Sequence, residues 1–160
     1  MDTNPVAPPQ FAKPVVDDIL LVEDNPNDAE LAIHAFRKYH LTDRIRLLCD
    51  GEEALDFIFG RGAYEGREVG VATRLILLDI KLPKIDGLEV LRQIKSDPRT
   101  RNIPVVMLTS SQEQRDIGAG YSRGANSYIV KPVDFGQLSE AIRTLGIYWL
   151  NLNYAPDRHN

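Results

Sequence analysis

The chain has 160 residues, of which 43% are hydrophobic and 26% are charged, and its formal net charge is −4. This length and composition fit one globular domain with a sizeable core and leave little chain for a second fold. The acidic balance argues against a nucleic-acid-binding protein, which would need a clustered basic face.

Two further features of the sequence bear on location. No apolar run is long enough to cross a bilayer, and the start lacks a basic segment followed by an apolar core, so we expect neither membrane association nor export. The single cysteine, Cys49, cannot form an internal disulfide, which favours a reducing, cytoplasmic location. We interpret Cys49 itself as a small buried residue on a strand.

The chain divides into three parts by composition. The first 16 residues contain four prolines among small and polar residues, which favours a flexible, extended lead-in over 1–16. Strand and helix patterns then alternate over 17–150, which we predict to be the folded domain, and 151–160 form a C-terminal tail.

The apolar run 19–22 predicts a buried strand that ends in the acidic pair Glu23 and Asp24. Two adjacent carboxylates repel each other, so they need solvent, a cation or another positive group. Asn25 is typical of a helix N-cap, and Asp28 lies in the first turn, where the helix dipole favours a negative charge. We expect the inward stripe of this helix to consist of Ala29, Ala32, Ile33 and Phe36.

The segment 45–49 predicts a second strand, which a short helix follows. Glycines over 60–70 then mark a long loop, and we interpret it as a surface connection because it lacks a glycine-loop motif. His34 and His40 have no neighbouring Cys or His cluster that could complete a metal site. We therefore interpret both as ordinary helix residues rather than as metal or phosphotransfer groups.

The run 75–78 is continuous, apolar and of strand length, so it predicts a strand buried on both faces, as in a parallel sheet. It ends at Asp79, and the Pro and Asp-Gly signals over 81–87 predict a loop before the next helix. Asp79 could simply end the strand and satisfy a loop amide. It could instead belong to a site, because ligands bind at this edge of open α/β sheets.

A fourth strand over 105–108 ends in Thr109, so a hydroxyl reaches the same edge. Ser110 and Glu113 have capping-box spacing and predict the start of a helix there. Two glycines weaken that helix, since each costs about 1 kcal/mol relative to Ala. A marginal helix beside a site is a candidate for the part that moves.

The last predicted strand covers 127–130 and ends in Lys131. The alternation of strands and helices predicts right-handed crossovers and an α/β fold, with a doubly wound sheet of about five parallel strands. Such a sheet would bring five polar side chains to one edge, namely Glu23, Asp24, Asp79, Thr109 and Lys131. These neighbours favour a site over a simple strand end at Asp79.

The chemistry of this set of side chains is specific. Three carboxylates make an oxygen-rich site of the kind that Mg²⁺ prefers. With Mg²⁺ present, Asp79 can ionise and attack phosphorus as a nucleophile, which would give an aspartyl phosphate. Lys131 can neutralise phosphoryl oxygens and Thr109 can donate a hydrogen bond to one of them.

With these residues the chain resembles the response-regulator receiver domains of two-component signalling. The likeness extends over 19–150 and is carried by five motifs: Val22-Glu23-Asp24-Asn25, Leu78 to Gly87, Leu108-Thr109-Ser110, Gly124-Ala125-Asn126-Ser127-Tyr128 and Lys131-Pro132. It implies a flavodoxin-like receiver fold with strand order 2-1-3-4-5. It also implies a signalling protein that accepts a phosphoryl group from a histidine kinase, with intrinsic autophosphorylation and autodephosphorylation, rather than an enzyme.

The resemblance also implies roles for single residues. Asp79 would be the phosphoacceptor, Thr109 and Lys131 would bind the phosphoryl group, and Tyr128 would rotate on phosphorylation, although it could equally be a half-buried strand aromatic. The implied Mg²⁺ environment consists of Glu23, Asp24, Asp79 and the backbone carbonyl of Lys81. Asp24 and Asp79 are favoured as direct ligands, because Glu23 stands where many relatives have Asp.

Two positions are expected to tune the lifetime of the phosphoryl group. Lys81 and Ser111 follow the phosphoacceptor and Thr109 by two residues each. Their side chains should therefore flank the line along which water attacks the aspartyl phosphate.

The subfamily resemblance is to stand-alone regulators that pair with phytochrome-type histidine kinases, because of the long loop over 60–70 and the Tyr148-Trp149-Leu150 ending. A relay intermediate for another sensor kinase is the alternative. An aspartate-nucleophile phosphatase of the haloacid-dehalogenase type is disfavoured, since such enzymes resemble one another in a second Asp where this chain has Lys81. A degenerate adaptor would have lost members of the site.

Large apolar residues follow the last predicted helix stripe and have no further strand to cover them. We therefore expect a homodimer with Tyr148, Trp149 and Leu152 in the interface. The subfamily resemblance implies that the pairing uses the fourth helix, fifth strand, fifth helix and C-terminal segment. The alternative is that these residues fold back as a lid on the same core.

Overall fold

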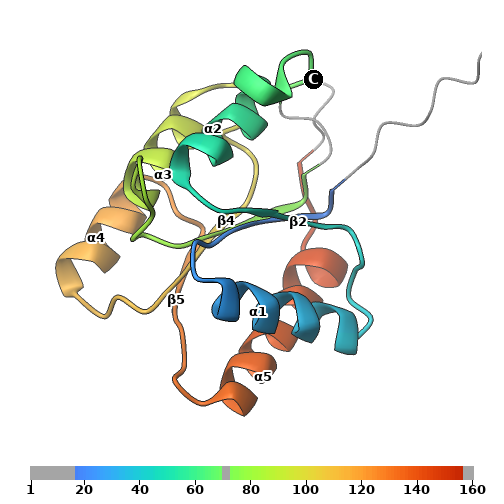
Figure 1. Ribbon diagram of the computed structural model, residues 1–160. Coiled ribbons are helices and arrows are strands. Elements are labelled where there is room, and N and C mark those ends of the chain that lie inside the picture. Colours follow the sequence, from blue (N-terminus) through green and yellow to red (C-terminus); the bar gives the residue numbers. More distant parts are fainter. Residues whose placement is uncertain (1–16, 70–72, 157–160) are drawn as a thin grey trace, which may run out of the picture.

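The computed structural model describes residues 17–69 and 73–156, and Figure 1 shows its chain trace. Five parallel strands form one sheet in the order β2-β1-β3-β4-β5. They are β1 (Ile19–Val22), β2 (Ile45–Leu48), β3 (Leu75–Leu78), β4 (Val105–Thr109) and β5 (Ser127–Val130). The predicted lead-in over 1–16 lies outside the described residues.

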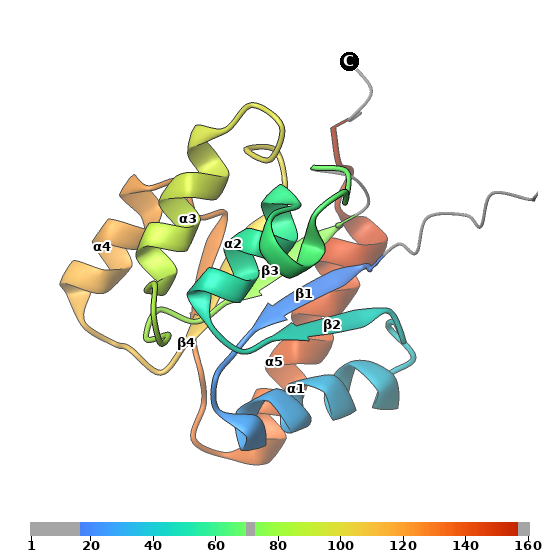
Figure 2. The same ribbon diagram turned by 45° about the horizontal axis from the view of Figure 1, so that its top comes forward.

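Helices cover both faces of the sheet, as Figure 2 shows. They are α1 (Pro26–Lys38), α2 (Gly51–Phe59), α3 (Gly87–Ser96), α4 (Gln114–Ser122) and α5 (Phe135–Gly146), with a 3₁₀ turn at Gly62–Tyr64 and a π-helical end at Ile147–Leu152. One apolar core lies under α1 and α5 and a second lies under α2 and α3. This architecture confirms the predicted doubly wound α/β fold.

The central strands are buried on both faces because they consist of continuous apolar runs. Every residue of β1, β3 and β4 is buried, whereas the edge strands β2 and β5 are largely half-buried. The register of the sheet aligns Val22 with Leu78, and it aligns Thr109 with Val130. The next residues along these strands therefore reach the same edge of the sheet together.

Side-chain caps start four of the helices at this edge. Asn25 Oδ1 accepts hydrogen bonds from the backbone N–H groups of residues 27 and 28 and so begins α1. The caps of α2, α3 and α5 are Asp50, Asp86 and Asp134, each of which accepts a backbone N–H bond. Capping satisfies free N–H groups of a first helical turn, so the starts of these four helices have defined positions.

The start of α4 differs from the prediction. The helix begins at Gln114, with Glu113 as an N-cap residue that makes no side-chain capping bond in the described part of the chain. Ser110 is exposed and lies in a non-helical segment that extends for three more residues. The capping-box interpretation of Ser110 is therefore wrong, because the chain leaves β4 as an extended loop before it turns into a helix.

The prediction for Cys49 is also wrong. Cys49 is exposed and lies one residue beyond the end of β2, in the turn that leads into α2. The apolar run continues one residue past the strand, so the pattern alone could not show where the strand ends.

On α1, Ala35 rather than Ile33 completes the buried stripe. In the described ranges, no helix combines the length and apolar character needed to cross a membrane.

Candidate functional site

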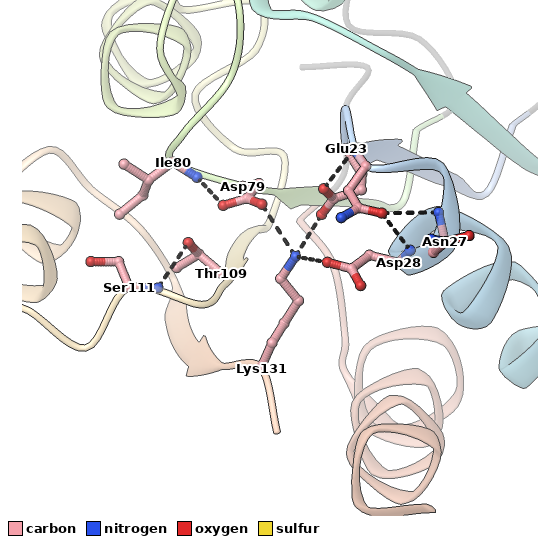
Figure 3. A network of polar contacts seen from close by, with 9 residues as sticks. Glu23, Asn27, Asp28, Asp79, Ile80, Thr109, Ser111 and Lys131 are labelled. Carbon is pink, nitrogen blue, oxygen red and sulfur yellow. Dashed lines mark hydrogen bonds and ion pairs between the residues drawn. The ribbon is translucent and has the colours of Figure 1, made fainter. Parts of the chain in front are cut away.

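The carboxyl edge of the sheet gathers the five predicted side chains, as Figure 3 shows for most of them. Glu23 and Asp79 follow the paired ends of β1 and β3, so they are neighbours and both are buried. Thr109 ends β4 and is buried, and Lys131 follows β5 with its backbone N–H bonded to the Thr109 carbonyl at 2.8 Å. Asp24 is exposed beside them.

Three carboxylates form a cluster that could hold a metal ion. Glu23, Asp24 and Asp79 each offer an oxygen, and these oxygens all lie within 4.8 Å of one another. Asp79 Oδ1 accepts the Ile80 N–H at 2.7 Å, which fixes the plane of that carboxylate. An all-oxygen set with one exposed member suits a hard divalent cation that keeps several waters. The donor set therefore fits the group that the sequence led us to expect.

Lys131 joins the carboxylates through its ammonium group. Its Nζ lies 2.8 Å from Glu23 Oε2, 2.9 Å from Asp28 Oδ2 and 3.2 Å from Asp79 Oδ2. Burial alone would lower the pKa of Lys131, but its hydrogen bonds to Glu23 and Asp28 and the charges of Asp79 and Glu23 raise the pKa above its ordinary value. The side chain is thus a fixed cation inside an acidic site.

Asp28 is the site residue that sequence reasoning missed. The helix dipole alone explains a negative charge in the first turn of α1, so this position does not by itself indicate a role in the site. The available signal was its spacing, because a residue in the first turn after a strand end faces the same edge of the sheet as that strand end. Asp28 is the partner that connects α1 to the end of β5 through Lys131.

Glu23 titrates in an unusual range. Burial raises the pKa of its carboxyl group to about 7, with a further upward contribution from the charge of Asp79, while the hydrogen bond from Lys131 opposes the shift. Its other oxygen accepts the Asn25 N–H at 3.1 Å. Near neutral pH, Glu23 is therefore partly protonated. A bound cation would favour its ionised form and release the proton.

The loop between β3 and α3 is held tightly behind Asp79. The Gly87 N–H donates to the Ile80 carbonyl at 2.7 Å, and a Cβ on Gly87 would lie 1.9 Å from the Asp79 carbonyl oxygen. Only a glycine allows this approach. Leu82 is buried while Lys81 is exposed, so the loop is anchored by one side chain and presents the other to solvent.

Thr109, Ser111 and Tyr128 form a second polar group beside the carboxylates. The Ser111 N–H donates to Thr109 Oγ1 at 3.3 Å, and the Tyr128 hydroxyl donates to the Ser111 carbonyl at 3.0 Å. Burial is the main cause of the raised pKa of the Tyr128 hydroxyl. The roles of these residues and of Lys81 stay predictions. His34 and His40 do not belong to the metal-capable cluster found in the described ranges.

The C-terminal segment is partly packed on the core and partly exposed, and the predicted homodimer stays a prediction. Leu150 is buried on the core beneath α1 and α5, and Trp149 is partly buried against the same core. Tyr148, Leu152 and Tyr154 are exposed. Trp149 and Tyr148 also line an open, mainly apolar groove of about 480 Å³ with Ile129, Gln137, Glu140, Ala141, Thr144 and Leu145.

A sequence model of the response regulator receiver domain matches residues 19–143. The chain belongs to this family. Among curated proteins, it is 44% identical over 138 residues to the probable methanogenesis regulatory protein FilR2 of Methanothrix harundinacea, which covers 86% of each chain. It is 36% identical to the response regulator Rcp1 of Synechocystis sp., over 86% of this chain and 92% of that protein.

Solved structures of single receiver domains superpose closely on the fold. The Mn²⁺-bound form of Rcp1 matches with a TM-score of 0.80 at 35% identity, over 87% of this chain and 98% of that one. The phosphorylated cyanobacterial phytochrome response regulator RcpA matches with a TM-score of 0.81 at 36% identity, over 89% and 99%. The bacteriophytochrome response regulator RtBRR is 47% identical over 89% and 86%, with a TM-score of 0.69.

Proposed function

We propose that the protein is a response regulator whose Asp79 accepts a phosphoryl group from the histidine of a kinase and which signals through altered protein contacts. An Asp79 carboxylate oxygen forms the new bond to phosphorus, the nitrogen–phosphorus bond of the donor breaks, and the imidazole nitrogen keeps the electron pair. The supporting observation is that Asp79 lies in hydrogen-bond reach of Lys131 and beside two other carboxylates.

The residues around Asp79 have the charges that this transfer needs. Mg²⁺ bound by Glu23, Asp24 and Asp79, with the Lys81 backbone carbonyl as a further ligand, would supply positive charge to the phosphoryl oxygens. Lys131 exchanges its contact with Asp79 for a phosphoryl oxygen, and the Thr109 hydroxyl donates to another. Tyr128 reports the change because its hydroxyl is bonded to the Ser111 carbonyl, two residues from Thr109.

The proposal makes the protein a signalling component with autophosphorylation and autodephosphorylation chemistry. A phosphatase of the haloacid-dehalogenase type remains disfavoured, because the position two residues after Asp79 is an exposed lysine. Receiver domains are phosphorylated by histidine kinases, and the RcpA and RtBRR names connect those two proteins to phytochromes. We infer a phytochrome-type kinase as the partner of this chain. Another sensor kinase is the alternative, since FilR2, which is 44% identical, is named as a probable methanogenesis regulatory protein.

A homodimer completes the proposal. The apolar groove beside Trp149 lies on α5 and β5, and Tyr148 and Leu152 are exposed next to it. Aromatic residues around an apolar patch are frequent interface hot spots. The groove supports an interface on β5, α5 and the segment that follows, and the resemblance to the subfamily extends the proposed interface to α4.

The function is tested by phosphorylation with acetyl phosphate or phosphoramidate, followed by mass spectrometry. We expect one added phosphoryl group that is acid-stable and base-labile, and we expect chelation of Mg²⁺ before the donor is added to prevent the labelling. Asp79→Asn should abolish it, whereas Asp86→Asn should not, because Asp86 is an exposed helix cap that asparagine can replace. Equal labelling of the Asp79→Asn protein would overturn the proposal. Phosphotransfer from a panel of purified kinases then separates a phytochrome-type partner from another sensor.

A further inference from the structure

Ser111 uses all three of its polar groups in separate contacts. Its backbone N–H donates to Thr109 Oγ1, and its carbonyl accepts from the Tyr128 hydroxyl. Its side-chain hydroxyl donates to Asp116 Oδ2 at 2.6 Å, and Asp116 lies in the first turn of α4. Ser111 itself is buried, and its bond to Thr109 is buried as well, while the bonds to Tyr128 and Asp116 are partly buried. One residue thus connects the proposed phosphoryl-binding hydroxyl, the proposed switch aromatic and a helix.

Helix α4 is attached to the domain by few strong contacts. Of its residues Gly120 is buried, and a Cβ at that position would lie 3.2 Å from the Tyr128 ring. Its N-cap residue, Glu113, makes no side-chain capping bond in the part of the chain that the structure describes. The first turn is held instead by the bond between Asp116 and Ser111. Helix α4 also packs against α3, but two of its contacts with the sheet side of the domain end on Ser111 and Tyr128.

We propose that Asp116 is a positioning residue for the Ser111 hydroxyl, and that through it the lifetime of the phosphoryl group depends on the position of α4. This inference rests on the proposed function of Asp79. The Asp116 carboxylate holds the Ser111 hydroxyl toward α4 and away from the phosphoryl group. A protein that binds α4 and moves its first turn breaks this bond and frees the hydroxyl. The regulator then loses its phosphoryl group at a rate that depends on whether its target is bound.

The chemical step is hydrolysis of the aspartyl phosphate. The oxygen of a water molecule forms a bond to phosphorus, the bond between phosphorus and the Asp79 oxygen breaks, and the carboxylate leaves with the electron pair. The water gives up one proton to the surrounding solvent, and inorganic phosphate is released. A hydroxyl near the attacking water can accept or donate a hydrogen bond and orient it. While its proton is bonded to Asp116, the Ser111 hydroxyl cannot donate to that water, and its oxygen is held toward α4.

The test is a double-mutant cycle on the decay of the phosphorylated protein in Mg²⁺. Asp116→Ala frees the Ser111 hydroxyl, and we expect the decay rate to rise at least threefold. In a Ser111→Ala background the same change should alter the rate by less than 1.5-fold, because no hydroxyl remains to be freed. Asp116→Asn keeps an acceptor and should restore near wild-type decay. Glu113→Gln is the matched control, since that exposed carboxylate pairs with Arg115 instead.

A second readout uses the unphosphorylated, metal-free protein. In nitrogen-15 NMR spectra, Asp116→Ala should shift the amide signals of Ser111 and Thr109, and Glu113→Gln should leave them in place. Gly120→Ala, which would press on Tyr128, should shift the same signals, whereas Gly118→Ala should not, because a Cβ at residue 118 meets nothing within 4 Å.

The outcomes separate this inference from the function on which it rests. If wild type cannot be phosphorylated at Asp79, the proposed function fails, and the inference fails with it. If wild type is phosphorylated and Asp116→Ala decays at the wild-type rate, the inference alone is overturned. An Asp116→Ala effect of equal size with and without the Ser111 hydroxyl also overturns it, because the coupling would then not pass through that hydroxyl.

Discussion

Lys131 and Glu23 form an ion pair of 2.8 Å in which the two side chains are 8% and 6% exposed. The pair joins the end of β5 to the end of β1 across the carboxyl edge of the sheet. A buried charge of this kind is tolerated because it is paired and hydrogen-bonded. The Lys131 ammonium therefore neutralises neighbouring carboxylates, as a divalent cation bound to the acidic cluster would.

The first prediction removes this cation. Lys131→Met leaves Glu23 and Asp79 buried without their positive partner, and we expect a loss of about 3 kcal/mol in the free energy of unfolding at pH 8 in EDTA. Mg²⁺ should recover part of the loss and bind more tightly than to wild type, because it no longer competes with an ammonium. Urea denaturation and calorimetric titration measure the two effects.

Lys84→Met is the matched control for that variant. Lys84 also lies between two carboxylates, at 3.5 Å from both Asp50 and Glu52, but its side chain is 60% exposed. Solvent screens an exposed ion pair, so we expect Lys84→Met to lose much less stability than Lys131→Met. Equal losses of stability in the two lysine variants would show that burial of the Lys131 pair has no energetic consequence.

The second prediction concerns pH. The folded protein raises the pKa of Glu23 from its ordinary value of 4.5 to about 7, so the folded state binds that proton more tightly than the unfolded state. The stability gained is fully present below pH 4.5 and is lost as pH rises through 7. In EDTA, the melting temperature of wild type should therefore fall more between pH 5.5 and 8.5 than that of Glu23→Gln.

Divalent cation should reverse this dependence, since it favours the ionised carboxylate. With Mg²⁺ present, wild type should be stabilised more at pH 8.5 than at pH 5.5. Glu52→Gln, which changes an exposed carboxylate, should follow wild type throughout. Parallel melting curves for wild type and Glu23→Gln across the pH series would contradict the assignment of the shift to Glu23.

The third prediction concerns the lifetime of the phosphoryl group. Substitution of Lys81 or Ser111 should change the dephosphorylation rate by more than about threefold, which corresponds to roughly 0.7 kcal/mol in the barrier. Lys81 is exposed on the loop after Asp79, and Ser111 is buried beside Thr109. Decay of the labelled protein is the measurement. Lys84→Met and Ser110→Ala are controls, and unchanged decay in both Lys81 and Ser111 variants would show that these positions do not control hydrolysis.

The sequence was informative about the sheet edge for a physical reason. Continuous apolar runs mark strands that are buried on both faces, and their abrupt ends place Asp79 and Thr109 at the carboxyl edge whatever the rest of the chain does. The pairing of Val22 with Leu78 then follows from strand order, and Glu23 becomes a neighbour of Asp79. Placement of these residues could be predicted, while their chemical roles remain for experiment.

Other parts of the site could not be predicted, because they depend on contacts between distant segments. Asp28 has a sufficient local explanation in the helix dipole, and only the folded chain shows its ion pair with Lys131, 103 residues away. The bond between Ser111 and Asp116 was missed because Ser110 offered a plausible cap for α4. Local sequence patterns explain helix starts and strand ends. They do not show with which of several polar neighbours a side chain forms a hydrogen bond or an ion pair.

The last prediction concerns the proposed homodimer. Trp149 packs edge-to-face with Tyr148 at a ring separation of 5.0 Å and lines the apolar groove on α5. A two-fold interface of standard size would bury roughly 1,200–2,000 Å² in total. Loss of Trp149 from its centre should then cost about 2 kcal/mol or more of association free energy.

Light scattering across a concentration series measures this loss. Trp149 is partly buried against the core, so Trp149→Ala could weaken the fold as well as the dimer. Leu152→Glu provides the second variant, because Leu152 is 68% exposed and its replacement should leave the monomer intact while it places a charge in the interface. Both variants should dissociate at concentrations where wild type is dimeric, and Phe59→Ala, remote from the groove, should not. A wild type that stays monomeric at high micromolar concentration, phosphorylated or not, would leave Trp149 and Leu150 as a lid on their own core.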